Sequence, residues 1–192
     1  VGGTSLMLLA IDVGNTQTVL GLYEADSGAA AADTGLIDHW RIRTDHDRTS
    51  DEHAVLIRNL LRQSGRDLEG TISGVAMCAG VPRVLASLRT MVDRYVDFDP
   101  VVIEPGVKTG MPILYDNPKE VGADRIANAV GAHDLYGGPT VVVDFGTGNR
   151  CAIFGRNFFE IVAHIIKDRW DFGITGFLDR YEGLHIICFG AD

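Results

Sequence analysis

The chain has 192 residues, of which 46% are hydrophobic and 22% are charged, and this composition excludes disordered and collagen-like proteins. Its 17 lysines and arginines stand against 26 aspartates and glutamates, which gives a formal net charge of −9. Because the basic residues form no cluster, bulk charge disfavours binding to nucleic acid or to an anionic membrane. The length allows one ordinary domain or two small ones.

The three cysteines, Cys78, Cys151 and Cys188, are far apart and odd in number. Neither they nor the six histidines have the spacing of a metal site, so we expect reduced thiols in a cytoplasmic protein and packing or surface roles for the histidines. No apolar run reaches the roughly 20 residues of a membrane span. The first apolar run is not preceded by the basic segment that is typical of a signal peptide. Residues 1–6, before Met7, are interpreted as a tag remnant or an alternative start.

Hydrophobic periodicity in the first hundred residues predicts the element order βββαβαβ. Strands are expected at residues 8–13 and 19–23, joined by a turn, and at residues 37–43. Thr49 and Glu52 have the spacing of a capping box, which predicts a helix over residues 50–63. The other expected elements are a strand at 72–78, a helix with Val84, Leu88, Met91 and Tyr95 on one face, and a strand at 101–104.

The second part of the chain repeats a feature of the first. A helix is expected over residues 121–136, followed by a Gly-Gly-Pro break at 137–139. Further elements are expected as strands at 140–145, 151–154, 158–163 and 185–189 and a helix at 173–181. Strands 8–13 and 140–145 carry the same Asp-x-Gly ending, which indicates an internal duplication with halves at 7–137 and 138–192, the second one shortened.

The repeated strand ending is a candidate phosphate site. It consists of Asp, any residue, Gly and a small polar residue, at positions 12–15 and again at 144–147. Glycine lets backbone N–H groups approach an anion, and the Asp can hold the magnesium ion of a bound nucleotide. A plain hairpin, whose polar residues only serve the turn, is the alternative for a single copy. The second copy favours two turns that face one cleft and hold the phosphates of a nucleotide.

Four motifs carry a resemblance to a known family. They are Met7-Leu-Leu-Ala-Ile-Asp-Val-Gly-Asn-Thr16, Trp40-Arg-Ile-Arg-Thr44, Tyr115-Asp-Asn-Pro-Lys-Glu-Val-Gly-Ala-Asp-Arg125 and Val143-Asp-Phe-Gly-Thr147. In this order and spacing, residues 7–147 resemble type III pantothenate kinases. The resemblance implies an α/β fold of two duplicated actin-like (ribonuclease H-like) halves, with mixed sheets flanked by helices. It also implies ATP-dependent phosphorylation of pantothenate to 4′-phosphopantothenate, the first step of coenzyme A synthesis.

Asp124 and Arg125 have chemistry that suits phosphoryl transfer. Transfer of a γ-phosphoryl group to an alcohol needs a carboxylate that orients the hydroxyl and accepts its proton, together with positive charge for the phosphate oxygens. An Asp-Arg pair in a solvated first helical turn is the alternative. By resemblance, Asp124 is the catalytic base, Arg125 and Gly122 contact pantothenate, and Tyr115 forms a wall of its pocket.

The resemblance also assigns the phosphate motifs and the ions. The first motif consists of Asp12, Gly14, Asn15 and Thr16, and the second of Asp144, Gly146 and Thr147. Magnesium is expected at Asp12, and a monovalent cation, K⁺ or NH₄⁺, near Asp144.

Assembly is a further expectation. The connection at 106–116 carries many apolar side chains for a loop in water, and Ala123, Ala127 and Gly131 form a small-residue face on the next helix. Relatives are homodimers whose pantothenate pocket borders the second subunit, so we expect a homodimer. Packing of both features inside the protomer is the alternative.

The sequence departs from the family after Thr147. Residues 148–150 read Gly-Asn-Arg, where relatives have small residues and threonines, and the rest aligns only in fragments. Either the second half is shortened, or the sequence omits segments of the complete protein. A member that keeps the pocket, has lost turnover and acts as a regulator is the alternative function.

Overall fold

The computed structural model describes residues 7–24, 35–104, 107–110, 113, 117, 120–137, 140–145, 150–154 and 185–190. The chain divides into two compact units. The first comprises residues 1–108 and 113–124, and the second comprises residues 109–112 and 125–192.

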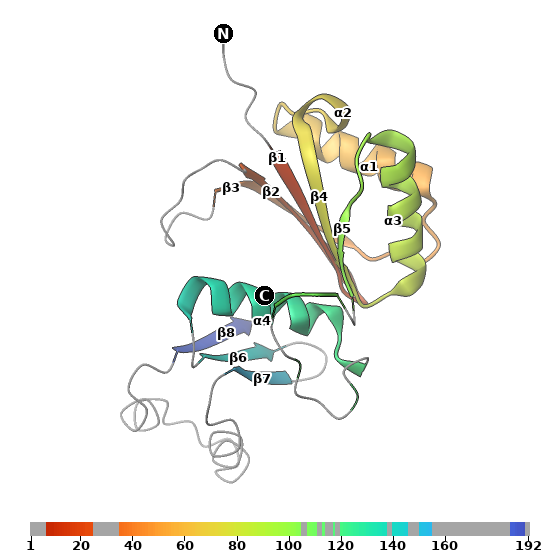
Figure 1. The fold of residues 1–192 in the computed structure, drawn as a ribbon. Coiled ribbons are helices and arrows are strands. Elements are labelled where there is room, and N and C mark those ends of the chain that lie inside the picture. Colours follow the sequence, from red (N-terminus) through yellow and green to blue (C-terminus); the bar gives the residue numbers. More distant parts are fainter. Residues whose placement is uncertain are drawn as a thin grey trace. The chain divides into compact units, whose positions relative to one another are not determined.

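The first unit is built on a mixed five-stranded sheet (Figure 1). Its strands in the order of the sheet are β3 (Leu36–Arg43), β2 (Gln17–Glu24), β1 (Met7–Val13), β4 (Ile72–Ala79) and β5 (Val101–Ile103). Strand β1 runs antiparallel to β2 and parallel to β4, and β4 runs parallel to β5. The parallel pairs need crossover connections, which the helices supply.

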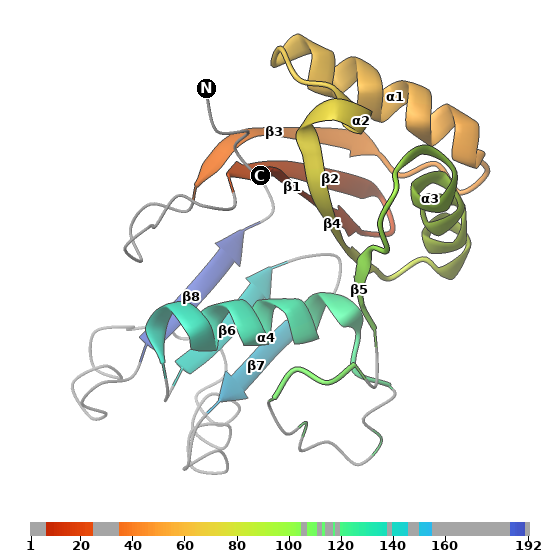
Figure 2. The same ribbon diagram turned by 45° about the horizontal axis from the view of Figure 1, so that its top comes forward.

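Two long helices, α1 (Ser50–Gln63) and α3 (Pro82–Tyr95), cover one face of this sheet (Figures 1 and 2). A short helix, α2 (Leu68–Thr71), leads into β4. Alternate residues of β1 enter the core beneath the helices, namely Met7, Leu9, Ile11 and Val13. Because successive side chains of a strand point to opposite faces, Asp12 lies on the face away from α1 and α3.

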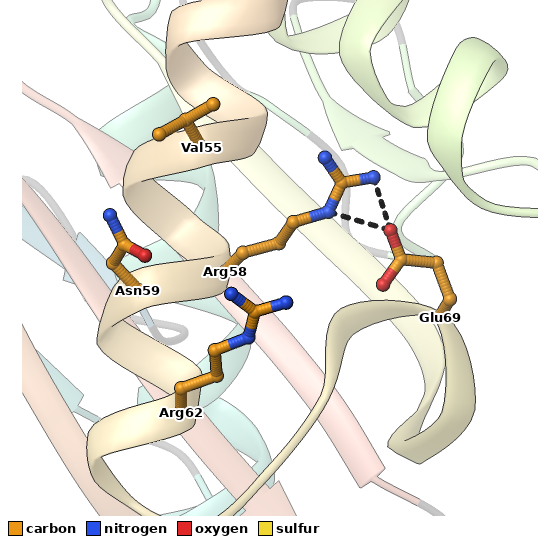
Figure 3. Close-up of a pocket in the computed structure, with 5 residues that line it drawn as sticks. All are labelled: Val55, Arg58, Asn59, Arg62 and Glu69. Carbon is orange, nitrogen blue, oxygen red and sulfur yellow. Dashed lines mark hydrogen bonds and ion pairs between the residues drawn. The ribbon is translucent and has the colours of Figure 1, made fainter.

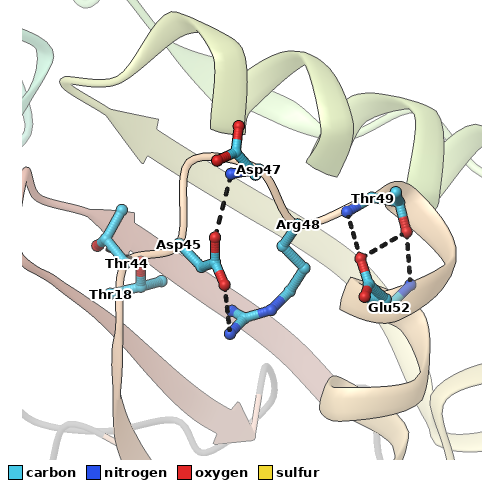
Figure 4. Close-up of polar contacts among 7 residues, drawn as sticks. All are labelled: Thr18, Thr44, Asp45, Asp47, Arg48, Thr49 and Glu52. Atoms are coloured by element: carbon cyan, nitrogen blue, oxygen red, sulfur yellow. Dashed lines mark hydrogen bonds and ion pairs between the residues drawn. The ribbon is translucent and has the colours of Figure 1, made fainter.

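The start of α1 follows the predicted capping box (Figure 4). The backbone N–H of Glu52 donates to the Thr49 hydroxyl at 3.3 Å, and the Glu52 carboxylate accepts from the Thr49 N–H at 2.8 Å. These two bonds satisfy helix-end donors that the helix itself leaves without acceptors. They fix the point at which the loop after β3 becomes helix.

The second unit contains a three-stranded sheet that repeats part of the first. Its order is β7 (Arg150–Phe154), β6 (Thr140–Phe145) and β8 (His185–Gly190), with β6 antiparallel to β7 and parallel to β8. Strands β2, β1 and β4 have the same order and directions. Helix α4 (Ala123–Tyr136) lies along one face of the second sheet (Figures 1 and 2). The repeated topology supports a duplication.

The predicted elements are confirmed wherever the structure describes them. Helix α4 begins two residues later than expected, and α2 was not predicted because four residues are too few for a periodic signal. The strand expected at 158–163 and the helix expected at 173–181 lie outside the described residues. Among the helices described, none is long and apolar enough for a membrane span.

His53 is a packing residue of α1, as expected for the histidines. It is only 4% exposed, and its Nε2 atom has no hydrogen-bond partner among the described residues. Burial, reinforced by the nearby Arg48 charge, lowers the pKa of His53 from 6.5 to about 4. The folded protein therefore holds a neutral imidazole that the unfolded chain protonates below pH 6.5.

We expect this histidine to make folding pH-dependent. The contribution of neutral His53 to the free energy of unfolding is fully present above pH 6.5. It is lost as pH falls towards 4, because the unfolded state then binds one more proton than the folded state. A pKa change of this size corresponds to roughly 3 kcal/mol when the whole shift is counted. In urea unfolding, the free energy of unfolding should fall less between pH 7 and pH 4.5 for His53→Leu and His53→Gln than for the wild type. Parallel pH profiles for all three proteins would contradict this.

Candidate active site

The first predicted phosphate motif forms the turn between β1 and β2. The N–H of Gly14 donates to the Gln17 carbonyl at 3.0 Å, and a Cβ at position 14 would lie 3.0 Å from that same oxygen. Any larger residue would crowd this bond, so the turn favours glycine. The side chains of Asn15 and Thr16 are exposed. The turn therefore presents polar groups to the solvent at the end of the sheet.

The carbonyl groups of this turn are bound to the segment that follows β3. Thr44 donates its hydroxyl to the Gly14 carbonyl at 2.8 Å and its N–H to the Thr16 carbonyl at 2.9 Å. His46 Nε2 donates to the Asn15 carbonyl at 3.3 Å. In a trans peptide the N–H points opposite to the preceding carbonyl. The N–H groups of Asn15 and Thr16 consequently face away from residues 44–46, which is the arrangement of an anion-binding turn.

Asp12 lies next to Cys78 on the sheet face opposite the helices. The two residues are direct partners in the parallel register of β1 and β4, so their side chains share a face. Cys78 is 6% exposed and donates a hydrogen bond to the Asp12 carboxylate. Burial, the charges of Asp12 and Asp124 and this hydrogen bond raise the pKa of Cys78 to about 12. The thiol is therefore a protonated donor at neutral pH.

Asp124 belongs to the same compact unit as Asp12. Both carboxylates are close enough for their charges to act on the Cys78 thiol. The predicted phosphate aspartate and the predicted base thus both act electrostatically on one buried cysteine. Gly122 also acts on Asp124, because a Cβ at position 122 would overlap the Asp124 Oδ1 atom. Glycine at this position leaves space for the carboxylate.

Arg125, the next residue of α4, is partly buried. Its Nε atom is buried and has no hydrogen-bond partner within the described parts of the chain. An unsatisfied buried donor costs about 1–3 kcal/mol, and more when it is charged. A carboxylate is a suitable partner for such a guanidinium group.

The other predicted site residues are placed only in part. Asp144 occupies β6 one residue before its end, as Asp12 does in β1. Tyr115, Gly146 and Thr147 lie outside the described residues. Across the described ranges, no group of three or more His, Cys, Asp and Glu side chains is placed to hold a metal ion. A single carboxylate at Asp12 suits magnesium that is held mainly by nucleotide phosphates and water.

A hollow of about 370 Å³ lies beside α1, lined by Val55, Arg58, Asn59, Arg62 and Glu69 (Figure 3). Arg58 forms an ion pair with Glu69 and stacks on the Tyr95 ring, 4.5 Å from its centroid. These contacts connect α1 to α2 and α3. The hollow lies on the helical side of the sheet, whereas Asp12 is on the opposite face. It is therefore separate from the predicted phosphate turn.

Comparisons with known proteins decide the family. A sequence profile described as type III pantothenate kinase matches residues 8–153. The chain belongs to the type III pantothenate kinase family. The curated type III pantothenate kinase of Streptomyces griseus is 56% identical over 145 residues, which are 73% of this chain and 52% of the relative. That of Thermobifida fusca is 46% identical over 183 residues, 94% of this chain and 67% of the relative.

This type III pantothenate kinase family member spans about half the length of several curated relatives that it matches. Among solved structures, a reductive activator for a corrinoid, iron–sulfur protein superposes with a TM-score of 0.51 and 13% identity. The match covers 80% of this chain and 30% of that one. At this identity the likeness concerns the fold alone. The expected actin-like α/β fold, with a mixed sheet flanked by helices, is confirmed.

Sequence reasoning missed three supporting residues. Thr18 lies in β2 and Thr44 directly after β3, 26 residues later, and only the pairing of these two strands brings the hydroxyls together. Cys78 has no signal in the sequence, because a lone cysteine has no spacing to a partner. A register that aligned residues 8–13 with residues 72–78 would have placed it beside Asp12.

Proposed function

We propose that the complete protein transfers the γ-phosphoryl group of ATP to pantothenate, giving 4′-phosphopantothenate and ADP in the cytoplasm. The observation that carries this proposal is that Asp12 and Asp124 belong to one compact unit and that the charges of both act on the Cys78 thiol. This arrangement supports a shared site for the predicted phosphate turn and the predicted base. Membership of the family supports pantothenate as the alcohol.

Asp124 performs the proton transfer in the proposed reaction. Its carboxylate accepts a hydrogen bond from the pantothenate hydroxyl and orients the oxygen towards the γ-phosphorus. As the new oxygen–phosphorus bond forms, the bond to the ADP oxygen breaks and the hydroxyl proton moves to Asp124. Gly122 leaves room for this carboxylate. Arg125, whose Nε lacks a partner among the described residues, pairs with the substrate carboxylate, and Tyr115 forms a wall of the pocket.

The turn after β1 binds the nucleotide phosphates. The outward N–H groups of Asn15 and Thr16 donate to phosphate oxygens, and Gly14 allows the close approach. Asp12 holds magnesium, which neutralises charge on the phosphates when it is bound. By analogy, Gly146 and Thr147 contact phosphate from the second motif, and Asp144 lies near the monovalent cation, K⁺ or NH₄⁺.

The proposed active form is a homodimer. On α4, Ala123, Ile126, Ala129 and Ala132 are buried, so the prediction that Ala123 belongs to the open face is wrong, whereas Gly131 and Leu135 are exposed. Ala127, Gly131 and Leu135 are spaced four residues apart and therefore share one helix face. A Cβ at Gly131 would meet no atom within 4 Å. This face permits close approach of a second helix.

We expect light scattering at micromolar concentration to give about twice the chain mass for the wild type. Ala127→Arg places a large cation on the proposed face and should shift the protein to the monomer. His133→Arg, at an exposed position on a different face of the same helix, also adds a cation and is the charge control. A fully active wild-type monomer would contradict the proposal.

A panel of small alcohols tests the choice of substrate. With ATP and magnesium, ADP release should require pantothenate and should stay at background with pantoic acid, pantolactone and simple sugars. Comparable turnover of another alcohol would instead identify a different kinase reaction in the same fold.

A further inference from the structure

Two buried threonines form a hydrogen-bonded chain beneath the phosphate turn. Thr18, in β2, is 5% exposed, and Thr44, directly after β3, is 8% exposed. Their hydroxyl oxygens are 2.8 Å apart, and the Thr44 hydroxyl is 2.8 Å from the Gly14 carbonyl oxygen. Figure 4 shows the two side chains next to each other at the start of the loop that leads to α1.

The direction of the chain follows from counting protons. A threonine hydroxyl has one hydrogen to donate and two lone pairs that accept. The Gly14 carbonyl can only accept, so the hydrogen of Thr44 is committed to it. Thr18 must therefore donate to Thr44. The sequence of donors is Thr18 to Thr44 to Gly14, and each bond polarises the next.

Thr44 binds the turn at two points. Besides its hydroxyl, its backbone N–H donates to the Thr16 carbonyl at 2.9 Å. The two bonds fasten the first and the last residue of the Gly14–Thr16 turn to the end of β3. They fix the direction of both carbonyl groups, and so that of the Asn15 N–H, which follows the Gly14 carbonyl. The Thr16 N–H follows the Asn15 carbonyl, which accepts from His46.

The loop after Thr44 is itself held in place, so it provides a firm anchor. The Asp45 carboxylate accepts from the Asp47 N–H at 3.1 Å and forms an ion pair with Arg48 at 3.9 Å (Figure 4). The capping box at Thr49 then fixes the start of α1. The turn is thus connected through Thr44 to a helix of the core rather than to a free loop.

We propose that Thr44, supported by Thr18, is a positioning residue for nucleotide binding. It holds the Gly14–Thr16 turn in the conformation that aims its N–H groups at the phosphates. This inference rests on the proposed function. The hydroxyl and N–H of Thr44 are both bound to the turn, so it acts through the turn.

Thr44→Val tests the proposal, because valine has a similar shape and no hydroxyl. The expected results are amide hydrogen exchange at residues 14–17 at least about tenfold faster than in the wild type and a Kd for the Mg²⁺ complex of a non-hydrolysable ATP analogue raised at least about tenfold. Thr44→Ser keeps the donor and should restore both quantities to within about threefold of the wild type. Thermal unfolding checks that each variant is folded.

Two further variants complete the design. Thr18→Val removes only the hydroxyl that donates to Thr44. We expect amide exchange at residues 14–17 and the Kd for the ATP analogue to rise by less than in Thr44→Val. Thr90→Val removes a hydroxyl that donates to the Ala86 carbonyl at 3.1 Å on α3, and it should change neither quantity. If Thr44→Val fails to fold, Thr18→Val decides the question by the same two measurements.

Unchanged exchange at residues 14–17 and unchanged Kd in the folded variants would overturn the inference and leave the proposed function intact. A wild type that binds no nucleotide would instead remove the proposed function. In that case the exchange measurement still decides whether Thr44 holds the turn.

Discussion

Asp124→Asn is expected to lower kcat by roughly 100-fold or more, which is the usual scale for a lost general base. Asparagine has nearly the same shape as aspartate, so the space that Gly122 leaves for this side chain remains filled in the same way. The amide can still form a hydrogen bond with the substrate hydroxyl, but it cannot accept the proton. Folding and the Kd for Mg²⁺-ATP should therefore stay close to those of the wild type.

The measurement is steady-state ADP release at saturating ATP and pantothenate, together with calorimetry for the nucleotide. Asp134→Asn is the matched control, because Asp134 is an exposed residue ten positions along the same helix. It should leave kcat unchanged. A kcat near that of the wild type in Asp124→Asn would remove Asp124 from the mechanism.

Asp12→Ala is expected to weaken Mg²⁺-ATP binding by roughly tenfold or more, the scale of a lost interaction with a charged group. The substitution removes the carboxylate proposed to hold magnesium, and it leaves the Cys78 thiol without its acceptor. Higher magnesium concentrations should partly restore binding. The Asp12 side chain is exposed and faces away from the core, so we expect little loss of stability.

Titration of magnesium at fixed ATP, followed by calorimetry, measures this effect. Asp93→Ala, at an exposed position of α3, controls for the loss of one negative charge from an acidic protein. If Asp12→Ala keeps the magnesium and ATP dependence of the wild type, the turn after β1 is only a hairpin.

The sequence was sufficient to predict the local elements of this fold. Alternating apolar residues define β1, and the Thr49–Glu52 pair marks the start of α1 at the residue where the structure has it. These patterns involve residues that are close in sequence, so they can be recognised without knowing which segments pack against them. The repeated Asp-x-Gly ending likewise anticipated the shared topology around β1 and β6.

The contacts that join distant segments could not be predicted in this way. The support of the turn by Thr44 depends on the antiparallel pairing of β2 and β3, and the place of Cys78 depends on the register of β1 and β4. The role of Gly122 depends on the side-chain conformation of Asp124. Each of these features depends on tertiary structure and produces no periodic pattern in the sequence.

The most direct test of the proposed function is identification of the product. The complete protein is incubated with ATP, pantothenate and magnesium in buffers that contain K⁺, NH₄⁺ or only Na⁺, and the mixture is analysed by mass spectrometry. We predict 4′-phosphopantothenate and ADP in equal amounts, more with K⁺ or NH₄⁺ than with Na⁺, and near background with Asp124→Asn. Nucleotide or pantothenate binding without phosphorylated product in any of the three buffers would contradict the account and favour a member of the family that has lost turnover.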